Sequence, residues 1–428
     1  MSEGSETADR TAFVPAVPPL SPDMRWHVFL SYRSVDRAWV INLYDVLRGH
    51  GFEVFLDQCV IQAGDTLLER IEQGLTASAA GVLIWSSATG DSEWCKHEYS
   101  TMESRASDSS FRFVPIQLDS TPLPAFARTR LFLGFSDYPE GPNGGELLRL
   151  LHGIVGQAMP PEAVRFATAQ TELVRKATAA VRAAIEAGNS ARLTELAGSP
   201  TAPWSTNSVL GCRAAEGLTR LGCYDEALAV LQTLSERFPH AIRPQQLKAL
   251  ALARRGGPGD VEAAQEVIGE LFHGGHRDPE TVGIYARTWT DRFAKSKDSR
   301  HLVHARDLYR AAFVAAPDDY YCGINAAAKS VMLGDDEIPA ARELAERLLK
   351  TLGRAAVLGD YWRTATIAEA LLIRGEYEEA ARLYRAAVVD APCEVGSHAS
   401  TALQARRLMD RLQPSAAARA AVEAAFTA

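Results

Sequence analysis

A glutamate that follows an apolar run is the residue of this chain best suited to chemistry. Residues 92–98 read SEWCKHE and end at Glu98, and a short polar loop separates them from the apolar run GVLIWS at residues 81–86. An apolar run, a polar loop and then an amphipathic helix are typical of a buried parallel strand and the helix after it. Glu98 is therefore expected near the carboxyl edge of a sheet, where open α/β folds build their ligand sites. A carboxylate in that position can stabilise positive charge that develops in a bound substrate.

Tyr32 and Arg33 follow the first predicted strand and are candidates for the same site. Arg33 suits a pyrophosphate group, because its planar guanidinium pairs with phosphate oxygens. The alternative is that Arg33 forms a surface ion pair with Asp36 or Asp57. The sequence leaves both interpretations open.

Three further side chains near the third predicted strand could contact a ligand. Ser86 and Ser87 could donate hydrogen bonds to it, although serines at strand ends often only cap the turn. One face of Trp94 could line the site while the other packs its helix onto the sheet, and packing alone is the alternative. Cys95 is not expected to be a nucleophile, because His97 points in a different direction on a helix.

Residues 26–157 alternate short apolar runs with helical patterns, which is typical of a parallel α/β sheet. The predicted strands are His27–Tyr32, Glu53–Leu56, Gly81–Ser86, Phe111–Leu118 and Leu131–Phe135. The predicted helices are Asp36–Gly49, Thr66–Thr76, Glu93–Arg105 and Gly145–Gln157. These elements fit a flavodoxin-like strand order of 2-1-3-4-5, in which the chain changes direction between the first and third strands. The loops that leave these two strands carry the candidate residues, so the fold rule indicates the same crevice as Glu98.

The chain beyond residue 158 is helical in pattern and rich in alanine, leucine, arginine and glutamate. A predicted helix at Glu162–Ala187 precedes a break at residues 198–203, GSPTAP. An alanine then recurs at steps of 36 to 41 residues, at positions 227, 264, 305, 341 and 380. Such periods are typical of stacked helical hairpins. In this interpretation Gly222 and Gly375 let two helices pass closely, the alanines pack where helices cross, and a proline ends the second helix.

Length and composition limit the class of protein. The chain has 428 residues, enough for two or three domains, with 47% hydrophobic and 23% charged residues. Its net charge is −8 and it contains no run of Lys or Arg, so nucleic acid is not expected as a partner. The six cysteines are scattered without metal-ligand spacing and indicate a reducing compartment rather than a disulfide framework.

No targeting or membrane segment is expected. Residues 1–24 are polar and contain prolines, which predicts a disordered tail rather than a signal peptide. No stretch approaches about 18 uninterrupted apolar residues, so a membrane is not expected as a partner. We therefore expect a cytoplasmic protein with no metal site and no bound cofactor. Glycine-rich phosphate loops of the Walker or Rossmann type are absent from the sequence, which argues against a kinase, an ATPase or a dehydrogenase.

The N-terminal motifs resemble those of TIR (Toll/interleukin-1 receptor) domains. The segment HVFLSYR at residues 27–33, followed by Asp36, is similar to the first conserved box of that family. The segment GFEVFLD at residues 51–57, followed by Gly64, is similar to its second strand and BB loop. The serines at 86–87 and the Trp-Cys-x-x-Glu spacing match its third strand and the next helix, so the resemblance covers roughly residues 25–157. His27 departs from the acidic residue that many members carry at the strand entrance.

The family contains scaffolds and enzymes that cleave NAD⁺ at the nicotinamide–ribose bond, and the enzymes resemble one another in a glutamate at the position of Glu98. The resemblance therefore implies NAD⁺ as the substrate, with Glu98 stabilising an oxocarbenium-like ribose as nicotinamide leaves. It also implies that the BB loop, framed by Asp57, Gly64 and Asp65, docks on a neighbouring TIR domain. Gly64 is expected at a positive φ, and this backbone conformation would by itself explain a glycine at that position.

The repeat region resembles degenerate tetratricopeptide repeats, and the segment YYCGINAA at residues 320–327 also resembles the regulatory region of stress-activated MAP kinase kinase kinases. The expected fold class is thus α/β plus all-α: a flavodoxin-like five-stranded parallel sheet and then a helical solenoid. The expected domains are a disordered tail at 1–24, a TIR domain at 25–157, a helical linker at 158–203 and a repeat domain at 204–428.

These observations predict an NAD⁺ glycohydrolase, releasing linear or cyclic ADP-ribose, that becomes active when its TIR domains cluster. By resemblance to similar two-part proteins, the role would be bacterial anti-phage or stress defence, with an unknown protein or ligand trigger bound by the repeats. A non-enzymatic adaptor that recruits partners through TIR–TIR and repeat contacts is the alternative. An enzyme acting on another nucleotide, such as NADP, is a third possibility.

Overall fold

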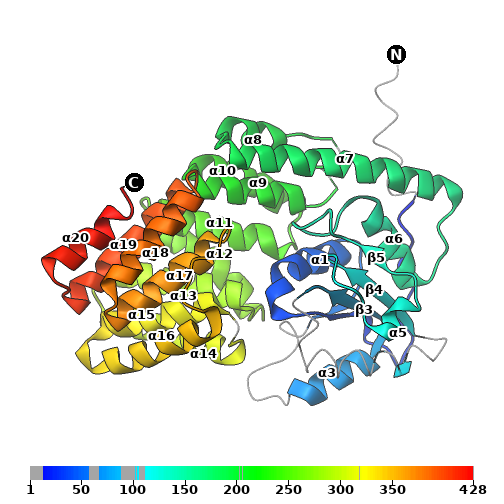
Figure 1. Ribbon diagram of the computed structural model, residues 1–428. Coiled ribbons are helices and arrows are strands. Elements are labelled where there is room, and N and C mark those ends of the chain that lie inside the picture. Colours follow the sequence, from blue (N-terminus) through cyan, green and yellow to red (C-terminus); the bar gives the residue numbers. More distant parts are fainter. Residues whose placement is uncertain are drawn as a thin grey trace. The chain divides into compact units, whose positions relative to one another are not determined.

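The computed structural model describes residues 13–56, 67–87, 102, 104–105, 111–201, 203–204, 206–317 and 319–427. The chain divides into two compact units. The sheet unit comprises residues up to 183 together with 195–213 and 233–244, and the repeat unit comprises residues 184–194, 214–232 and 245–428. Figure 1 shows the sheet in blue to cyan and the later helices in green to red.

The sheet unit contains a five-stranded parallel sheet. Its strands are β1 (Trp26–Ser31), β2 (Val54–Phe55), β3 (Ser78–Trp85), β4 (Arg112–Gln117) and β5 (Leu133–Gly134). They run in the order β2-β1-β3-β4-β5, and each neighbouring pair is parallel. This order confirms the predicted flavodoxin-like sheet. The central strands are buried almost without interruption, as expected when helices cover both faces.

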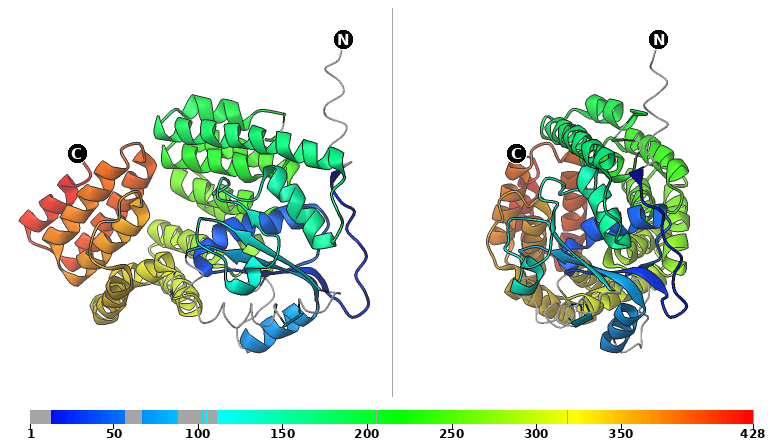
Figure 2. Two further views of the ribbon diagram at one scale, coloured as in Figure 1. Left: turned by 45° about the vertical axis from the view of Figure 1, so that its right-hand side comes forward. Right: turned by 90° about the vertical axis from the view of Figure 1, so that its right-hand side faces the viewer.

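Two layers of helices cover the sheet. Helices α1 (Arg37–Gly49) and α6 (Gly144–Val155) share one apolar cluster with β1 and β3, whereas α3 (Leu67–Thr76) shares another cluster with the opposite face. Figure 2 shows these layers from two further directions. Trp39 of α1 anchors its layer, because its ring packs against Phe135 and its Nε1 donates a 2.8 Å hydrogen bond to the Tyr138 carbonyl.

The sheet unit differs from the prediction in strand length and in one short helix, and β2 spans two residues where Glu53–Leu56 was predicted. The fifth strand is shorter than the predicted Leu131–Phe135, because the side chain of Leu131 is 91% exposed and does not join the core. A four-residue helix, α5 (Ala125–Arg128), was not predicted. Of the predicted helix at Glu93–Arg105, only Met102, Ser104 and Arg105 are described, and the buried Met102 packs on the same face as α3.

The segment at residues 13–24, predicted as part of a disordered tail, packs on the sheet unit. Val14 and Val17 contact the apolar cluster of α1 and α6. The Phe13 carbonyl lies 2.9 Å from Nε2 of His152, and the Phe13 ring centroid lies 5.2 Å from that of Phe166. The few apolar residues of this segment suffice because they are added to a core that the sheet already forms.

Helices follow the sheet, and most of them form pairs. The long α7 (Pro161–Glu186) matches the predicted helix at 162–187, and α8 (Ser190–Ala197) comes next. The pairs are α9 (Val209–Arg220) and α10 (Tyr224–Arg237), α11 (Ile242–Arg255) and α12 (Asp260–His273), α13 (Pro279–Ser296) and α14 (Ser299–Ala315), α15 (Tyr320–Leu333) and α16 (Ile338–Leu352), α17 (Tyr361–Arg374) and α18 (Tyr377–Asp390), and α19 (Val395–Leu412) and α20 (Ala416–Ala424). This succession confirms the predicted helical repeat.

Four of the first helices of the pairs pack against one another. Helix α15 packs against α17 and α19, α17 packs against α19, and α13 packs against α15. We call the first helices of the pairs (α9, α11, α13, α15, α17 and α19) the inner layer. The second helices carry the recurring alanines, and all five alanines are buried, as predicted for residues at helix crossings. They are Ala227, Ala264, Ala305, Ala341 and Ala380.

The glycines of the repeat have a different role from the predicted one. Gly222 has a φ of 81° and Gly375 a φ of 88°, so both lie in the left-handed region. A Cβ on Gly375 would meet nothing nearer than the Tyr377 hydroxyl at 4.0 Å, so close helix packing does not require a glycine there. Gly375 instead ends α17 as a left-handed cap, where glycine carries no steric penalty. The prolines behave as predicted, since α10, α14 and α18 end two residues before Pro239, Pro317 and Pro392.

None of the helices in the described ranges is both long enough and apolar enough to cross a membrane.

Candidate functional site

The ends of β1 and β3 bring a serine and an aspartate together. Parallel pairing places both carboxyl ends at one edge of the sheet. The chain leaving β1 makes a 3-10 turn at Ser34–Asp36, and this turn carries Asp36 across to β3. The Ser86 hydroxyl, which is buried, donates a 2.7 Å hydrogen bond to Oδ2 of Asp36. The predicted crevice edge therefore contains at least one polar contact that joins two strands.

A second aspartate joins this edge from β4. The Ser87 backbone N–H donates a 2.7 Å hydrogen bond to Oδ2 of Asp119, and the Thr121 N–H donates one of 2.8 Å to Oδ1. Asp119 was missed by the sequence analysis. Its position directly after the predicted strand Phe111–Leu118 was the available signal, since loops at the carboxyl ends of neighbouring strands meet at the same crevice.

The two carboxylates have pKa values shifted in opposite directions. Burial raises the pKa of Asp36, the Ser86 hydrogen bond lowers it, and the nearby charges of Asp119 and Arg33 raise and lower it respectively. Burial alone would also raise the pKa of Asp119, but hydrogen bonds from Thr121 and Ser87 outweigh it and lower that pKa. The described groups that act on one another here are two carboxylates and one guanidinium, so their summed charge is acidic, which favours a ligand that carries or develops positive charge.

The predicted site residues fall into two groups. Arg33, Ser86 and Ser87 lie at the crevice edge, where the Arg33 charge lowers the pKa of Asp36. Tyr32 is half-buried and packs against the core of the α1 face. The remaining candidates lie outside the described residues: Glu98, Trp94, Asp57, Gly64 and Asp65. The ligand roles of both groups stay predictions.

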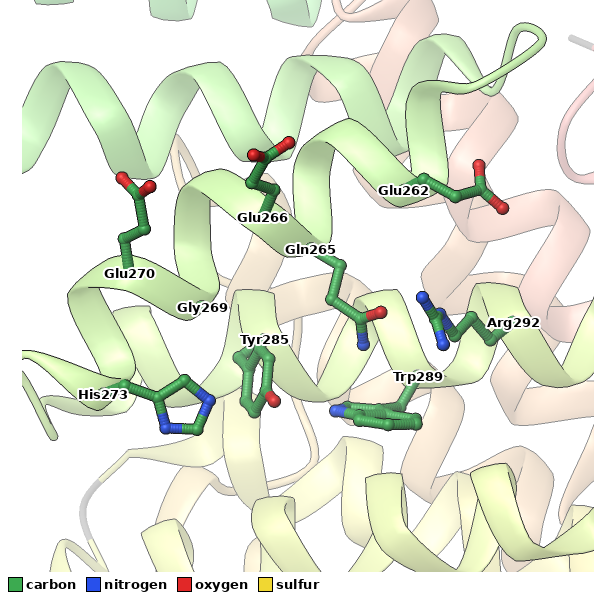
Figure 3. A pocket seen from close by; sticks show the side chains of 9 residues that line it. All are labelled: Glu262, Gln265, Glu266, Gly269, Glu270, His273, Tyr285, Trp289 and Arg292. Atoms are coloured by element: carbon green, nitrogen blue, oxygen red, sulfur yellow. The ribbon is translucent and has the colours of Figure 1, made fainter.

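The repeat unit contains a separate hollow of about 520 Å³ between α12 and α13. Figure 3 shows its lining, with Gln265 pointing from α12 toward Trp289 of α13. Tyr285 stacks on Phe272 at 4.6 Å, and the Arg292 guanidinium lies 5.4 Å from the Trp289 ring centroid. Three acidic side chains of α12 also line it: Glu262, Glu266 and Glu270. This face was not predicted, because one sequence does not show which side of a solenoid helix meets its neighbour.

Comparison with known proteins identifies both parts of the chain. Residues 28–148 match the profile of the TIR domain family, and residues 223–333 match that of the Tetratricopeptide Repeats-Sensor family. The chain combines a TIR domain with a tetratricopeptide-repeat sensor domain. Both predicted resemblances are thereby confirmed.

Several curated proteins are similar to the TIR domain. The 2′ cyclic ADP-D-ribose synthase of Bacteroides thetaiotaomicron is 29% identical over 96 residues, which are 22% of this chain and 33% of that protein. A probable 2′ cyclic ADP-D-ribose synthase of Brachypodium distachyon is 34% identical over 103 residues, 23% of this chain and 44% of that protein. A third, from Brucella melitensis, is 28% identical over 98 residues, 23% of this chain and 39% of that protein. The chain thus spans less than half the length of these relatives.

The solved structure of a thermophilic TPR protein of Thermus thermophilus aligns with 45% of this chain and 96% of its own, at 18% identity and a TM-score of 0.36.

The TIR match runs from β1 into α6, so Asp36, Ser86 and Asp119 all lie inside the TIR domain. The sensor match runs from α10 through α15 and contains the hollow of Figure 3.

Proposed function

We propose that the TIR domain cleaves the nicotinamide–ribose bond of NAD⁺. The observation that supports this most directly is the net-acidic crevice edge formed by Asp36, Ser86 and Asp119 at the ends of three neighbouring strands. Nicotinamide is cationic in NAD⁺ and leaves as a neutral ring, so the barrier lies in the positive charge that the ribose acquires. Negative potential at the crevice stabilises that charge.

In this mechanism Glu98 is the residue that approaches the ribose. The C1′–N bond breaks, its electron pair stays on the pyridine nitrogen, and the Glu98 carboxylate hydrogen-bonds the ribose and stabilises its cation. Water then adds to C1′ and loses a proton, which gives ADP-ribose, or another group of the same nucleotide adds and gives a cyclic product. The names of the similar proteins favour the cyclic product.

The other candidates would bind the rest of the nucleotide. Arg33 would contact the pyrophosphate, with Tyr32, Ser87 and Trp94 around the ribose and the bases. Ser86 already donates its hydrogen to Asp36, so it would act chiefly by keeping that carboxylate ionised. The proposed domain limits remain 25–157 for the TIR domain, 158–203 for a linker and 204–428 for the repeat domain.

Activation would follow from clustering of a cytoplasmic protein. If the BB loop around Asp57, Gly64 and Asp65 completes the site of a neighbouring TIR domain, the active state is rare until a trigger at the sensor domain raises the local concentration. Bacterial defence against phage or stress fits such control, because an NAD⁺-consuming enzyme that is always active would damage its own cell.

The test compares Glu98→Gln with Glu69→Gln, an exposed glutamate of α3. Nicotinamide release from NAD⁺ is measured by chromatography for both variants and wild type, with and without forced clustering. We expect Glu98→Gln to lose at least about 100-fold in rate, a size typical of losing one electrostatic stabiliser, and Glu69→Gln to match wild type. Equal rates for Glu98→Gln and wild type would exclude the assigned role. A wild type that releases no nicotinamide even when clustered would support the adaptor function.

A further inference from the structure

One cluster of charged side chains in the inner layer contains more cations than carboxylates. Four cations come from four different helices, and two carboxylates accompany them. The cations are Arg254 (α11), Arg287 (α13), Lys329 (α15) and Arg407 (α19), and the carboxylates are Asp291 (α13) and Glu369 (α17). The charges of these six groups act on one another's pKa values, and we call the six the inner-layer cluster; Arg220 and Lys295 also act on members of it.

Each carboxylate of the inner-layer cluster has a cation near it, but only Glu369 is hydrogen-bonded, since Oδ2 of Asp291 is buried without a hydrogen-bond partner in the described part of the chain. Gln404 bridges one pair: Lys329 Nζ donates to its Oε1 at 2.8 Å, and its Nε2 donates to Glu369 Oε1 at 2.7 Å. Asp291 lies 3.6 Å from Nε of Arg287, one helical turn away. Burial raises the pKa of Glu369 and lowers the pKa of Lys329, and the attraction between the two groups opposes both shifts.

Two guanidinium groups of the cluster form no hydrogen bond or ion pair with a described carboxylate, although the Asp291 charge acts on Arg407. Among the described residues, neither Arg254 nor Arg407 has a hydrogen-bond or ion-pair partner, and Nε of Arg254 is buried with no acceptor. The Arg254 guanidinium lies 5.3 Å from the ring centroid of Trp362 on α17. Burial and the charge of Arg287 lower the pKa of Arg254 to about 10, so the group stays charged at neutral pH.

The described groups that act most strongly on the charge of Arg254 include no carboxylate. The hydroxyls of Tyr224 and Tyr321 act on its charge, and Arg220 adds to the repulsion although it is itself paired with Glu394 at 3.1 Å. A partly buried cation without a counter-charge costs free energy in the empty protein. Such an arrangement is favourable when an anion supplies the missing charge, and planar guanidiniums and hydroxyls suit the several oxygens of a phosphate.

We propose that the inner layer binds a small phosphate-bearing anion, held by Arg254 and Arg287 with the tyrosine hydroxyls beside them. The residues that hold the anion are only partly exposed, so a folded partner would have limited access to them. We therefore expect a small anion. This site is distinct from the hollow of Figure 3, which lies on the opposite face of α13 and has three glutamates in its lining. Those carboxylates would repel a phosphate.

The test uses the full chain carrying Glu98→Gln and measures heat on titration with inorganic pyrophosphate. We expect saturable binding that weakens as salt is added, since the attraction is between charges. Arg254→Gln should weaken binding at least about tenfold, the loss of one charge-assisted contact. Arg254→Lys should give an intermediate loss, because it keeps the charge and loses the planar fork. Arg385→Gln, an exposed arginine of α18, should bind as tightly as the parent.

A second measurement separates a binding role from a structural one. Without pyrophosphate, Arg254→Gln should unfold at the same temperature as the parent chain or a higher one, because an uncompensated charge is removed. With pyrophosphate, only the parent and Arg385→Gln should gain thermal stability. The proposal is wrong if the parent shows no saturable binding, if Arg254→Gln binds equally well, or if a glutamate-rich peptide binds in place of pyrophosphate. Each of those results leaves the proposed NAD⁺ cleavage untouched.

Discussion

The crevice edge of the TIR domain and the inner-layer cluster of the repeat unit both gather charge, but of opposite sign. Among the described residues, the crevice places Asp119 and Arg33 close enough to act on Asp36, whereas the inner-layer cluster contains four cations and two carboxylates. The crevice obtains its groups from loops after three strands, and the inner layer obtains them from the faces of separate helices. One chain thus offers a site suited to developing positive charge and another suited to an anion.

The two regions also stabilise their charges differently. In the crevice, neutral donors stabilise the carboxylates by hydrogen bonds: the Ser86 hydroxyl donates to Asp36, and the Ser87 backbone N–H donates to Asp119. In the inner layer, the pair of Lys329 and Glu369 is held by Gln404, and both of its charges are almost fully buried. A buried pair depends strongly on both members, whereas a partly solvated carboxylate can lose a donor at smaller cost.

The largest effect on stability is expected from breaking that buried pair. Lys329 is 2% exposed and Glu369 is 6% exposed, so Lys329→Met leaves a carboxylate inside the inner layer without its cation. We expect the free energy of unfolding to fall by about 3 kcal/mol. Denaturation in urea, followed by circular dichroism of the helical signal, measures this change.

The control replaces both members of the pair. Lys329→Met combined with Glu369→Leu removes the stranded charge together with its partner, so the double variant should recover most of the lost stability. If the double variant is as unstable as Lys329→Met alone, the loss comes from packing rather than charge, and the comparison between the two regions fails at this point.

A smaller effect on stability is expected from removing the Ser86 hydroxyl, which donates a hydrogen bond to Asp36. Ser86→Ala leaves Asp36 buried without its 2.7 Å donor, and we expect the free energy of unfolding to fall by about 1–2 kcal/mol at neutral pH. The loss should shrink as the pH falls, because a protonated Asp36 no longer needs the hydrogen bond. Thermal unfolding of Ser86→Ala and of Ser87→Ala measures it, and the exposed Ser87 side chain should have little effect. Equal losses for both serines would contradict the assignment of the hydroxyl contact.

The sheet region was largely predictable from the sequence because its signals are local. Apolar runs and turn residues gave the strand order, and the crevice rule brought Arg33 and Ser86 to one edge. Asp119 was not predicted because its part in the site depends on how far the loop after β4 reaches toward Ser87. The exposure of Leu131 was not predicted because an apolar residue at a sheet edge looks the same in sequence as one in the core.

The helical region was predictable only as a repeat. The spacing of the alanines located the second helices, since each alanine meets the same steric demand in every pair. The inner-layer cluster was not predicted because the spacing of residues in the sequence shows which of them share one helix face. It does not show which faces of distant helices meet. Arg254 and Trp362 come from helices far apart in the chain, and only the stacking of the pairs brings them within 5.3 Å.

The smallest effects distinguish the two crevice carboxylates by sign. The pKa of Asp36 is raised in the folded protein, so its contribution to stability is fully present below its ordinary value of 3.8 and is lost as the pH rises through the raised pKa. The pKa of Asp119 is lowered, so its contribution is present above 3.8 and is lost as the pH falls through the lowered pKa. Asp36→Asn should therefore raise the melting temperature at neutral pH, and Asp119→Asn should lower it slightly, because solvent screens that carboxylate.

Thermal unfolding of the two variants and wild type between about pH 3.5 and 7.5 tests this pair of signs. The gain from Asp36→Asn should disappear at the acid end, where wild-type Asp36 is also neutral, and the loss from Asp119→Asn should diminish there as well. An asparagine at position 36 can still accept the Ser86 hydrogen, so a change in melting temperature would report the charge and not a lost contact. Shifts of the same sign in both variants would mean that the crevice does not hold one strained and one stabilised carboxylate. The contrast with the cation-rich inner layer would then rest on the sensor domain alone.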